Sequence, residues 1–281
     1  MNLSVRGKRR LKAAVTNGIM MAIMIFYLLP FWYVVNNAFK ERSYISLQPF
    51  TINLDIFTLD NIISAFSKMN YPAAFFNSFA VLAISCLIFI LLGSMTAYGI
   101  YIADHKFFNR LYVLFVALIA LPFQAAMVPL VTLLRTLHLS DNFLGLALIY
   151  SAMFMPFIVF LYTGFMRSLP KELMESARID GCSYFQVYAY VYMPLLKTVT
   201  GIVLVLRGVY VWNDLQVPLI VINNPVRQTL QQRLYVFAQS RIGNFDLVFA
   251  GALLTCLPMI LLFLMMQKSF IKGVMAGSVK G

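Results

Sequence analysis

The chain has 281 residues, and its mean hydropathy is +0.82. Only 11% of the residues are charged, whereas an average soluble domain carries about 25%. These values exclude an ordinary soluble protein and indicate an integral membrane protein. The net charge is +12, but no nucleic-acid-binding motif accompanies it, so we expect contact with membrane lipid and no nucleic-acid partner.

In chain order, the apolar segments predict six transmembrane helices. A helix needs about 20 residues to cross the roughly 30 Å of hydrocarbon in a bilayer. All of these segments lack charged residues except the fifth, which Arg207 and Asp214 interrupt. We therefore expect an all-α membrane protein with one transmembrane domain over residues 13–267, between tails at 1–12 and 268–281. The predicted spans are residues 13–35, 75–100, 111–133, 142–165, 198–222 and 247–267.

The basic residues predict the orientation of these spans. Five Lys and Arg residues precede the first span, a pattern shared with signal peptides. However, the apolar run is longer than a signal peptide requires and no small-x-small cleavage site follows it, so we expect a retained anchor. With the N-terminus inside, the cytoplasmic segments hold twice as many Lys and Arg residues as the external loops. Both termini are therefore expected in the cytoplasm.

Motifs for nucleotide or metal chemistry are absent from the sequence. It contains neither the phosphate-binding G-x-x-x-x-G-K-[ST] nor the zinc motif H-E-x-x-H. The predicted topology places His105 and His138 on opposite sides of the membrane. The three cysteines form no C-x-x-C pair and resemble small buried hydrophobes. We expect no metal site and no enzymatic activity.

One charged segment, residues 168–197, is too polar to span the membrane and is expected on the cytoplasmic side. Pro170 and Gly181 fit the start and end of a short helix over residues 171–180. Ser183-x-x-Gln186 fits the capping box of a second helix, which Pro194 should end. Its aromatic stripe would pack on the bundle, leaving the first helix either to cap its own bundle or to dock a cytoplasmic partner. The stripe consists of Phe185, Tyr188, Ala189 and Tyr192.

The same segment resembles a loop of ABC importer permeases. "ESARIDGC" (175–182), followed by "MPL" (193–195), is similar to their E-A-A-x-x-D-G-A loop with its later L-P. Ser176 and Cys182 replace two alanines of that pattern, and both are small. The wider resemblance is to membrane subunits of carbohydrate-uptake importers of the maltose and oligosaccharide type. It is carried by "FWYVVNNAFK" (31–40), "WND" (212–214), "FAGALLTCLP" (249–258) and "KGVMAGSVKG" (272–281).

This resemblance implies a multi-pass permease subunit in the bacterial plasma membrane. Its implied partners are a second homologous permease, a dimer of ATPase subunits and an extracytoplasmic solute-binding protein. The ATPase would bind ATP and Mg, so no cofactor is expected in this chain. The external loop 37–70 would contact the binding protein or be a solvated connector, and the tail 273–281 would reach the ATPase or be disordered. The residues implied to couple to the ATPase are Glu175, Ser176, Ala177, Asp180, Gly181 and Pro194.

The fifth span carries the candidate substrate path. Arg and Asp each cost about 2.5 to 3.5 kcal/mol at the bilayer centre, so this span needs neighbouring helices or water. Arg207, Tyr210 and Asp214 have the i, i+3, i+7 spacing of one helix face. They would either line a path for a polyhydroxyl solute or fix the packing with a partner permease. An alternative function is a secondary transporter or channel subunit without an ATPase, and a third is an assembly or scaffold protein.

Overall fold

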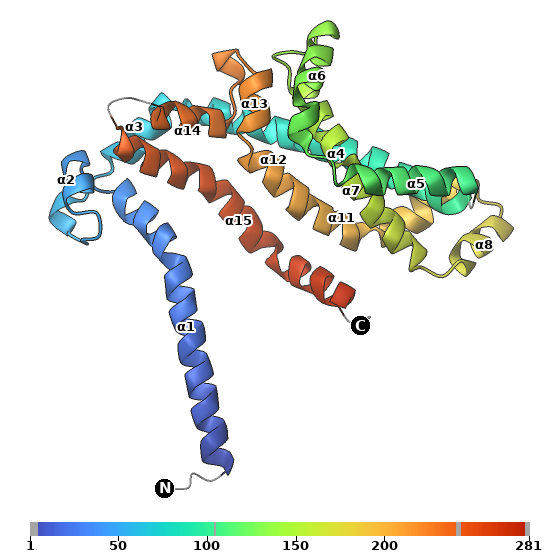
Figure 1. The fold of residues 1–281 in the computed structure, drawn as a ribbon, viewed down its shortest axis with the longest axis horizontal. Helices are drawn as coiled ribbons and strands as arrows, with labels where there is room; N and C mark the ends of the chain where they lie inside the picture. Colours follow the sequence, from blue (N-terminus) through green and yellow to red (C-terminus); the bar gives the residue numbers. More distant parts are fainter. Residues whose placement is uncertain (1–4, 104, 240–242, 279–281) are drawn as a thin grey trace. The chain divides into compact units, whose positions relative to one another are not determined.

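The computed structural model describes residues 5–103, 105–239 and 243–278, and within these residues the chain is almost entirely helical (Figure 1). An isolated β-bridge joins Lys40 to Phe57. The α-helices are α1 (Val5–Ala38), α2 (Arg42–Leu47), α3 (Asp60–Lys68), α4 (Tyr71–Ala103), α5 (Lys106–Leu118), α6 (Phe123–Thr136), α7 (Phe143–Arg167), α8 (Glu172–Ile179), α9 (Tyr184–Gln186), α10 (Met193–Leu195), α11 (Lys197–Val203), α12 (Val209–Asn213), α13 (Gln216–Val221), α14 (Leu230–Ala238) and α15 (Phe245–Ser278). The 3₁₀ turns are η1 (Leu54–Ile56) and η4 (Pro225–Arg227), and the π-helices are η2 (Val187–Tyr192) and η3 (Leu204–Gly208).

Four of these helices are long and apolar enough to cross a membrane, and the number rises to six if two bent helix pairs each count as one span. The four are α1, α4, α7 and α15. The bent pairs are α5 with α6, and the run from α9 to α10 with the run from α11 to α12. The prediction of a helical chain with several membrane-spanning helices is therefore confirmed. Helix α15 continues past the predicted span end to Ser278, so most of the tail predicted at 273–281 is helical, and residues 279–281 lie outside the described residues.

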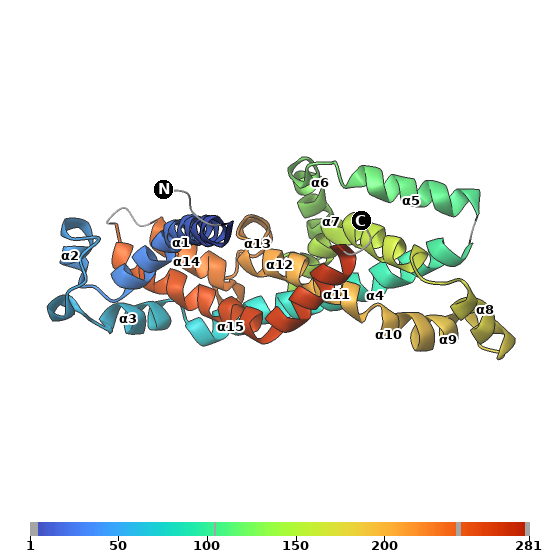
Figure 2. The same cartoon turned by 90° about the horizontal axis from the view of Figure 1, so that it is seen from below.

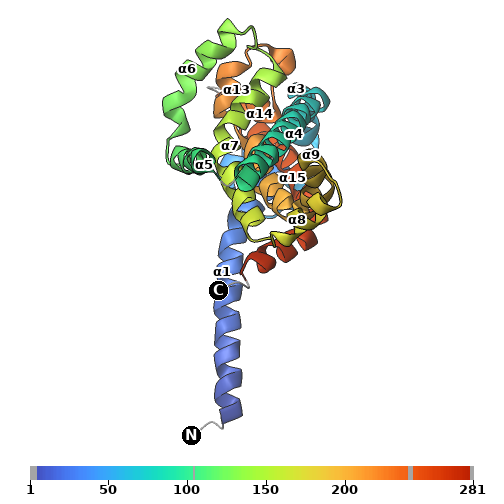
Figure 3. The same ribbon diagram turned by 90° about the vertical axis from the view of Figure 1, so that its right-hand side faces the viewer.

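The prediction of one continuous helix over residues 111–133 is wrong. The chain breaks at residues 119–122, and α5 and α6 meet there at 105° (Figure 3). Pro122 explains the break, because it disfavours the helical conformation of the residue before it, and its own backbone is extended with ψ 123°. The third span is therefore two helices of different direction.

The predicted fifth span, residues 198–222, is also interrupted. The π-helix η3 lies between α11 and α12, and the helix then ends at Asn213 because Asp214 is extended with ψ 136°. A new helix, α13, begins at Gln216. The polar residues predicted on this span therefore lie at or beside irregular backbone.

The described residues form two compact units. The first contains residues up to 69 together with 234–257, and its polar contacts close the loop that follows α1. The Lys40 ammonium is buried and donates to the carbonyl oxygens of Gln48 at 2.7 Å and Thr51 at 2.9 Å. Asn61 donates to the carbonyl oxygen of Lys40 at 2.7 Å. Burial lowers the pKa of Lys40, and the carbonyl contacts make this loop an ordered structure.

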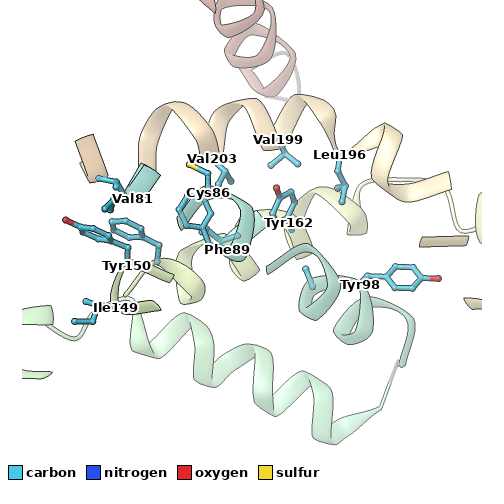
Figure 4. Close-up of a cluster of buried hydrophobic side chains, with 14 of the residues drawn as sticks. Val81, Cys86, Phe89, Tyr98, Ile149, Tyr150, Tyr162, Leu196, Val199 and Val203 are labelled. Carbon is cyan, nitrogen blue, oxygen red and sulfur yellow. The ribbon is translucent and has the colours of Figure 1, made fainter. Parts of the chain in front are cut away.

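The second unit, residues 70–233 and 258 onward, has its core between α4 and α7, which lie side by side (Figure 3). Ile158 of α7 is fully buried against Gly93 of α4, where an added Cβ would lie 2.5 Å from Ile158 Cγ2. Tyr162 of α7 is also buried, and its hydroxyl lies 2.9 Å from Thr200 Oγ1 on α11. Figure 4 shows Tyr162 beside Val199 in this core. Helices α4, α7 and α11 thus form the frame on which both candidate sites stand.

Candidate functional site

The segment after α7 contains the short helix α8, a glycine joint and a second helical run that starts at Tyr184. Helix α8 ends at Ile179, and Gly181 adopts a left-handed conformation with φ +84°. The amide of Cys182 donates to the carbonyl oxygen of Ala177 at 3.0 Å, and that of Gly181 donates to Arg178 at 3.1 Å. This bonding satisfies the last carbonyl groups of α8, as is typical of helices that end in glycine.

The second helix starts with the predicted capping box. Ser183 Oγ accepts from the backbone amide of Gln186 at 3.3 Å, while the Ser183 amide donates to Gln186 Oε1 at 2.7 Å. Arg178 links the two helices, because its guanidinium donates to the carbonyl oxygen of Cys182 and lies 4.3 Å from the ring centroid of Tyr184. Only Gly181 and Cys182 lie between Asp180, the last residue of the α8 turn, and Ser183, the N-cap of the second helix. Local hydrogen bonds therefore fix the direction of α8 relative to the second helix.

An aromatic cluster, called the mount below, packs the second helical run, residues 184–195, against the C-terminal end of α4. The hydroxyl of Tyr188 lies 2.7 Å from Ser94 Oγ, and the Tyr98 hydroxyl donates to the carbonyl oxygen of Tyr184 at 2.9 Å. The Tyr192 ring is fully buried and packs against the rings of Tyr98 and Tyr101. The predicted aromatic stripe is therefore confirmed for Tyr188 and Tyr192. Phe185 departs from it, because its side chain is exposed.

The second helical run ends one residue after Pro194, close to the predicted end. The helical path continues through α10 to Leu195, and the 69° bend follows at Leu196. Proline has no backbone N–H to donate to the carbonyl of the preceding turn. The residues just before Pro194 form the π-helix η2, whose hydrogen bonds already depart from the α-helical pattern. Pro194 therefore lies inside the mount and before the bend.

Helix α8 lies next to α9 (Figure 2), and most of its side chains are exposed. The side chains of Glu175, Ser176 and Asp180 are exposed, whereas Ala177 faces inward and is buried. Ile179 is a large apolar side chain that is 86% exposed. An isolated helix of eight residues is marginal in water, so its order comes from the caps and the mount.

The three polar residues of the fifth span share one face, as predicted, and that face contacts α7. The Arg207 guanidinium lies 3.9 Å from the ring centroid of Phe157, and the Tyr210 ring meets the Phe154 ring edge to face. The Tyr150 hydroxyl donates to Asp214 Oδ2 at 2.8 Å. Tyr150, Phe154 and Phe157 were not identified as partners from the sequence. Their spacing of four and three residues nevertheless places them on one face of α7.

Asp214 holds the break between α12 and α13. Besides the bond from Tyr150, its carboxylate accepts from the backbone amides of Gln216 at 3.2 Å and Val217 at 3.1 Å. These amides are the first of α13, whose positive end favours a carboxylate. The bonds occupy both oxygens of Asp214, whereas Arg207 and Tyr210 have only ring contacts from α7.

Arg207 lines a cavity of about 220 Å³. Its walls come from the α5–α6 break, the middle of α7 and η3. The lining residues are Leu118, Ile119, Leu121, Phe123, Gln124, Met153, Phe154, Pro156, Phe157 and Arg207. No group of three or more potential metal ligands occurs among the residues that the structure describes. Among these lining residues, the polar side chains are the guanidinium of Arg207 and the amide of Gln124.

Comparison with known proteins identifies the family. Residues 89–275 match the family described as "Binding-protein-dependent transport system inner membrane component". The chain belongs to this family. It is 32% identical over 257 residues to the "Melibiose/raffinose/stachyose import permease protein MelC" of Bacillus subtilis, covering 91% of this chain and 92% of that one. It is 31% identical over 266 residues to the "Arabinooligosaccharides transport system permease protein AraQ" of the same organism, covering 93% of both. The predicted family of ABC permeases for carbohydrate uptake is thus confirmed, and these relatives are transport permeases rather than enzymes.

Solved structures share the fold. A chain of "a bacterial ABC transporter involved in the import of the acidic polysaccharide alginate" superposes with a TM-score of 0.79 at 17% identity, covering 96% of this chain and 100% of that one. An alginate ABC transporter in complex with an "alginate pentasaccharide-bound periplasmic protein" gives a TM-score of 0.64 at 14% identity, covering 92% and 94%. The helical architecture of this permease is therefore that of an ABC importer subunit.

Proposed function

We propose that this permease is one membrane subunit of an ATP-driven sugar importer in the bacterial plasma membrane. It pairs with a second homologous permease to form the translocation path and receives sugar from an extracytoplasmic solute-binding protein. Two ATPase subunits bind the ATP and Mg. Support comes from the family, from relatives named for sugar import, and from the structural neighbour that holds a periplasmic protein.

The observation that carries the coupling is the exposed helix α8, whose C-terminal end is fixed by the Gly181 joint and the capping box of Ser183. The side chains of Glu175, Asp180 and the apolar Ile179 are exposed, while Ala177 is buried and α8 packs on η2, whose aromatic residues contact α4. A rigid, exposed knob fits a groove on a separate subunit and transmits the movement of that groove to the spans. Both termini and α8 lie in the cytoplasm in this proposal, because the predicted cytoplasmic segments are the more basic ones.

The residues of the candidate path divide into two roles. Asp214 fixes the α12–α13 break through Tyr150 and the α13 amides, so it positions the path. In the described residues Arg207 and Tyr210 make ring contacts and no side-chain hydrogen bond, so their donors other than the buried Arg207 Nε can bind a polyhydroxyl solute. The solute passes beside α7, where the partly exposed Phe157 provides an apolar surface for a sugar ring.

Purification under mild detergent tests the coupling. Proteins recovered with the wild-type chain, identified by mass spectrometry, should include an ATPase and a second permease. Ile179→Asp, which places a third negative charge beside Glu175 and Asp180, should lower ATPase recovery at least several-fold and leave the second permease in place. The matched control Leu137→Asp changes an exposed leucine outside α8 and should alter neither. Wild-type recovery without any ATPase, or equal ATPase recovery with Ile179→Asp, would contradict the proposal.

A further inference from the structure

Among the described residues of the second unit, no carboxylate pairs with the charge of Arg207. Its guanidinium lies against two aromatic rings, 3.9 Å from the centroid of Phe157 and 4.9 Å from that of Phe154. Its Nε is buried and has no hydrogen-bond partner, and in the described part of the chain Arg207 forms no ion pair. Asp214, on the same face, is already engaged by Tyr150 and two backbone amides. Cation–π contacts offset only part of the cost of a charge in a membrane span.

The cavity beside Arg207 adds further donors. Gln124 lines it from the second position of α6, a helix of 14 residues. No side chain caps the first amides of α6, because its N-cap residue is Pro122. The start of this helix therefore adds partial positive charge to that of Arg207. Irregular backbone at membrane depth, such as residues 119–122, is tolerated where it lines a polar cavity.

The position of the cavity selects a solute over a lipid. Met153 and Phe157 are near the middle of α7, which begins at Phe143 and ends at Arg167. At 1.5 Å per residue they lie about 15 Å or more from either end of the helix, deeper than lipid phosphates. The volume of about 220 Å³ is below that of a drug-sized site and admits a single ring or charged group.

Given the importer function proposed above, we propose that this cavity binds the carboxylate of an acidic sugar during transport. A guanidinium presents a planar fork of N–H groups that matches a carboxylate, and the Gln124 amide adds a further donor. The partly exposed ring of Phe157 would then lie beside the sugar ring. The substrate class is thus an anionic saccharide, and Arg207 is the residue that selects for its charge.

A binding measurement with two probes that differ in the carboxylate tests this inference. The full chain, with whatever subunits purify with it, is placed in nanodiscs of phosphatidylcholine and titrated calorimetrically with D-glucuronate and D-glucose at pH 7. We expect glucuronate to bind about tenfold or more tightly than glucose, as charge-assisted hydrogen bonds imply. Arg207→Gln should abolish that preference, and Arg207→Lys should retain part of it. Arg135→Gln, an exposed change on α6, should leave the preference unchanged.

Several outcomes would overturn the inference. These are equal binding of both sugars by the wild type, a preference that survives Arg207→Gln, or loss of glucuronate binding when phosphatidylglycerol is added, which would assign the site to a lipid headgroup. Inorganic phosphate that competes as well as glucuronate would show a general anion site. Loss of the second permease from Arg207→Gln, with no sugar binding by the wild type, would assign the counter-charge to that permease.

Two further controls keep the test interpretable. Gln124→Leu lowers the glucuronate preference without removing the charge, so it reports on the cavity even if Arg207→Gln does not fold, which size-exclusion chromatography would reveal. Wild-type glucuronate binding in a preparation that contains no ATPase would contradict the importer and still support the anion site. Failure of one proposal is therefore distinguishable from failure of the other.

Discussion

At the scale of single residues, Gly181 shows how a backbone conformation can matter more than space. No atom lies within 4 Å of a Cβ added there, so the bulk of a side chain meets nothing. Its φ of +84° is the constraint, because side chains other than those of Asn and Asp are strained in that region by about 1 to 2 kcal/mol. A side chain at Gly181 is therefore disfavoured by the backbone conformation and not by lack of room.

Substitution of Gly181 tests this directly. Gly181→Val should distort the joint between α8 and the capping box of Ser183, uncouple ATP hydrolysis from uptake, and leave the protein inserted. Gly181→Asn should keep at least half of the wild-type uptake, because asparagine tolerates the left-handed conformation. Uptake and ATP hydrolysis would be measured in the same vesicles. Equal losses in the two variants would mean that the exposed surface of Gly181, rather than its φ, is what the ATPase requires.

Residue roles set by neighbours in the sequence could be predicted, and those set by tertiary contacts could not. The left-handed Gly181 and the Ser183–Gln186 capping box involve bonds within a few residues, so their chemistry is visible in the sequence. The three hydrogen bonds of Asp214 include one from Tyr150, 64 residues away. No spacing in the sequence identifies such a partner, so the division of Asp214 and Arg207 into separate roles required the structure.

At the scale of elements, hydropathy predicted the positions of the helices but not their direction. The apolar run through residues 111–133 is uninterrupted, so its length indicated one span, although Pro122 turns the chain by 105°. The π-helices η2 and η3 leave no clear pattern in the sequence either, because their bonding shifts by a single residue. In such a chain, a proline inside an apolar run indicates where the span bends better than the length of the run does.

The contact between α4 and α7 can be tested with two glycines of the same helix. Alanine at either position gains about 1 kcal/mol of helix propensity. Gly99 has nothing within 4 Å of an added Cβ, so Gly99→Ala should leave the melting temperature in detergent unchanged or raise it. At Gly93 the Cβ would lie 2.5 Å from Cγ2 of the buried Ile158, so Gly93→Ala should destabilise the unit by about 1 to 3 kcal/mol.

A double-mutant cycle confirms the cause of that loss. Ile158→Ala removes Cγ2, so Gly93→Ala should cost much less in that background than in the wild type. The coupling energy would be obtained from thermal unfolding of the four proteins in the same detergent. Similar effects of Gly93→Ala and Gly99→Ala would show that α4 and α7 do not pack as closely as the Gly93–Ile158 contact requires.

At the scale of the whole molecule, the proposed function depends on which side of the membrane α8 occupies. The distribution of Lys and Arg predicts that the loop after α1 is external and that α8 is cytoplasmic. Each segment offers a highly exposed apolar residue for labelling, Leu54 at 83% in η1 and Ile179 at 86% in α8. In a cysteine-free background, a charged, impermeant maleimide applied to intact cells should label Leu54→Cys and leave Ile179→Cys unlabelled.

The same reagent should label both variants after purification in detergent, which controls for the reactivity of each thiol. The expected contrast follows from the membrane alone, because the two side chains are almost equally exposed in the folded chain. Labelling of Ile179→Cys but not Leu54→Cys in intact cells would invert the topology. Helix α8 would then face away from the compartment that holds ATP, and the coupling proposal would fail, whereas the Arg207 cavity, which lies near the middle of α7, would be unaffected by the inversion.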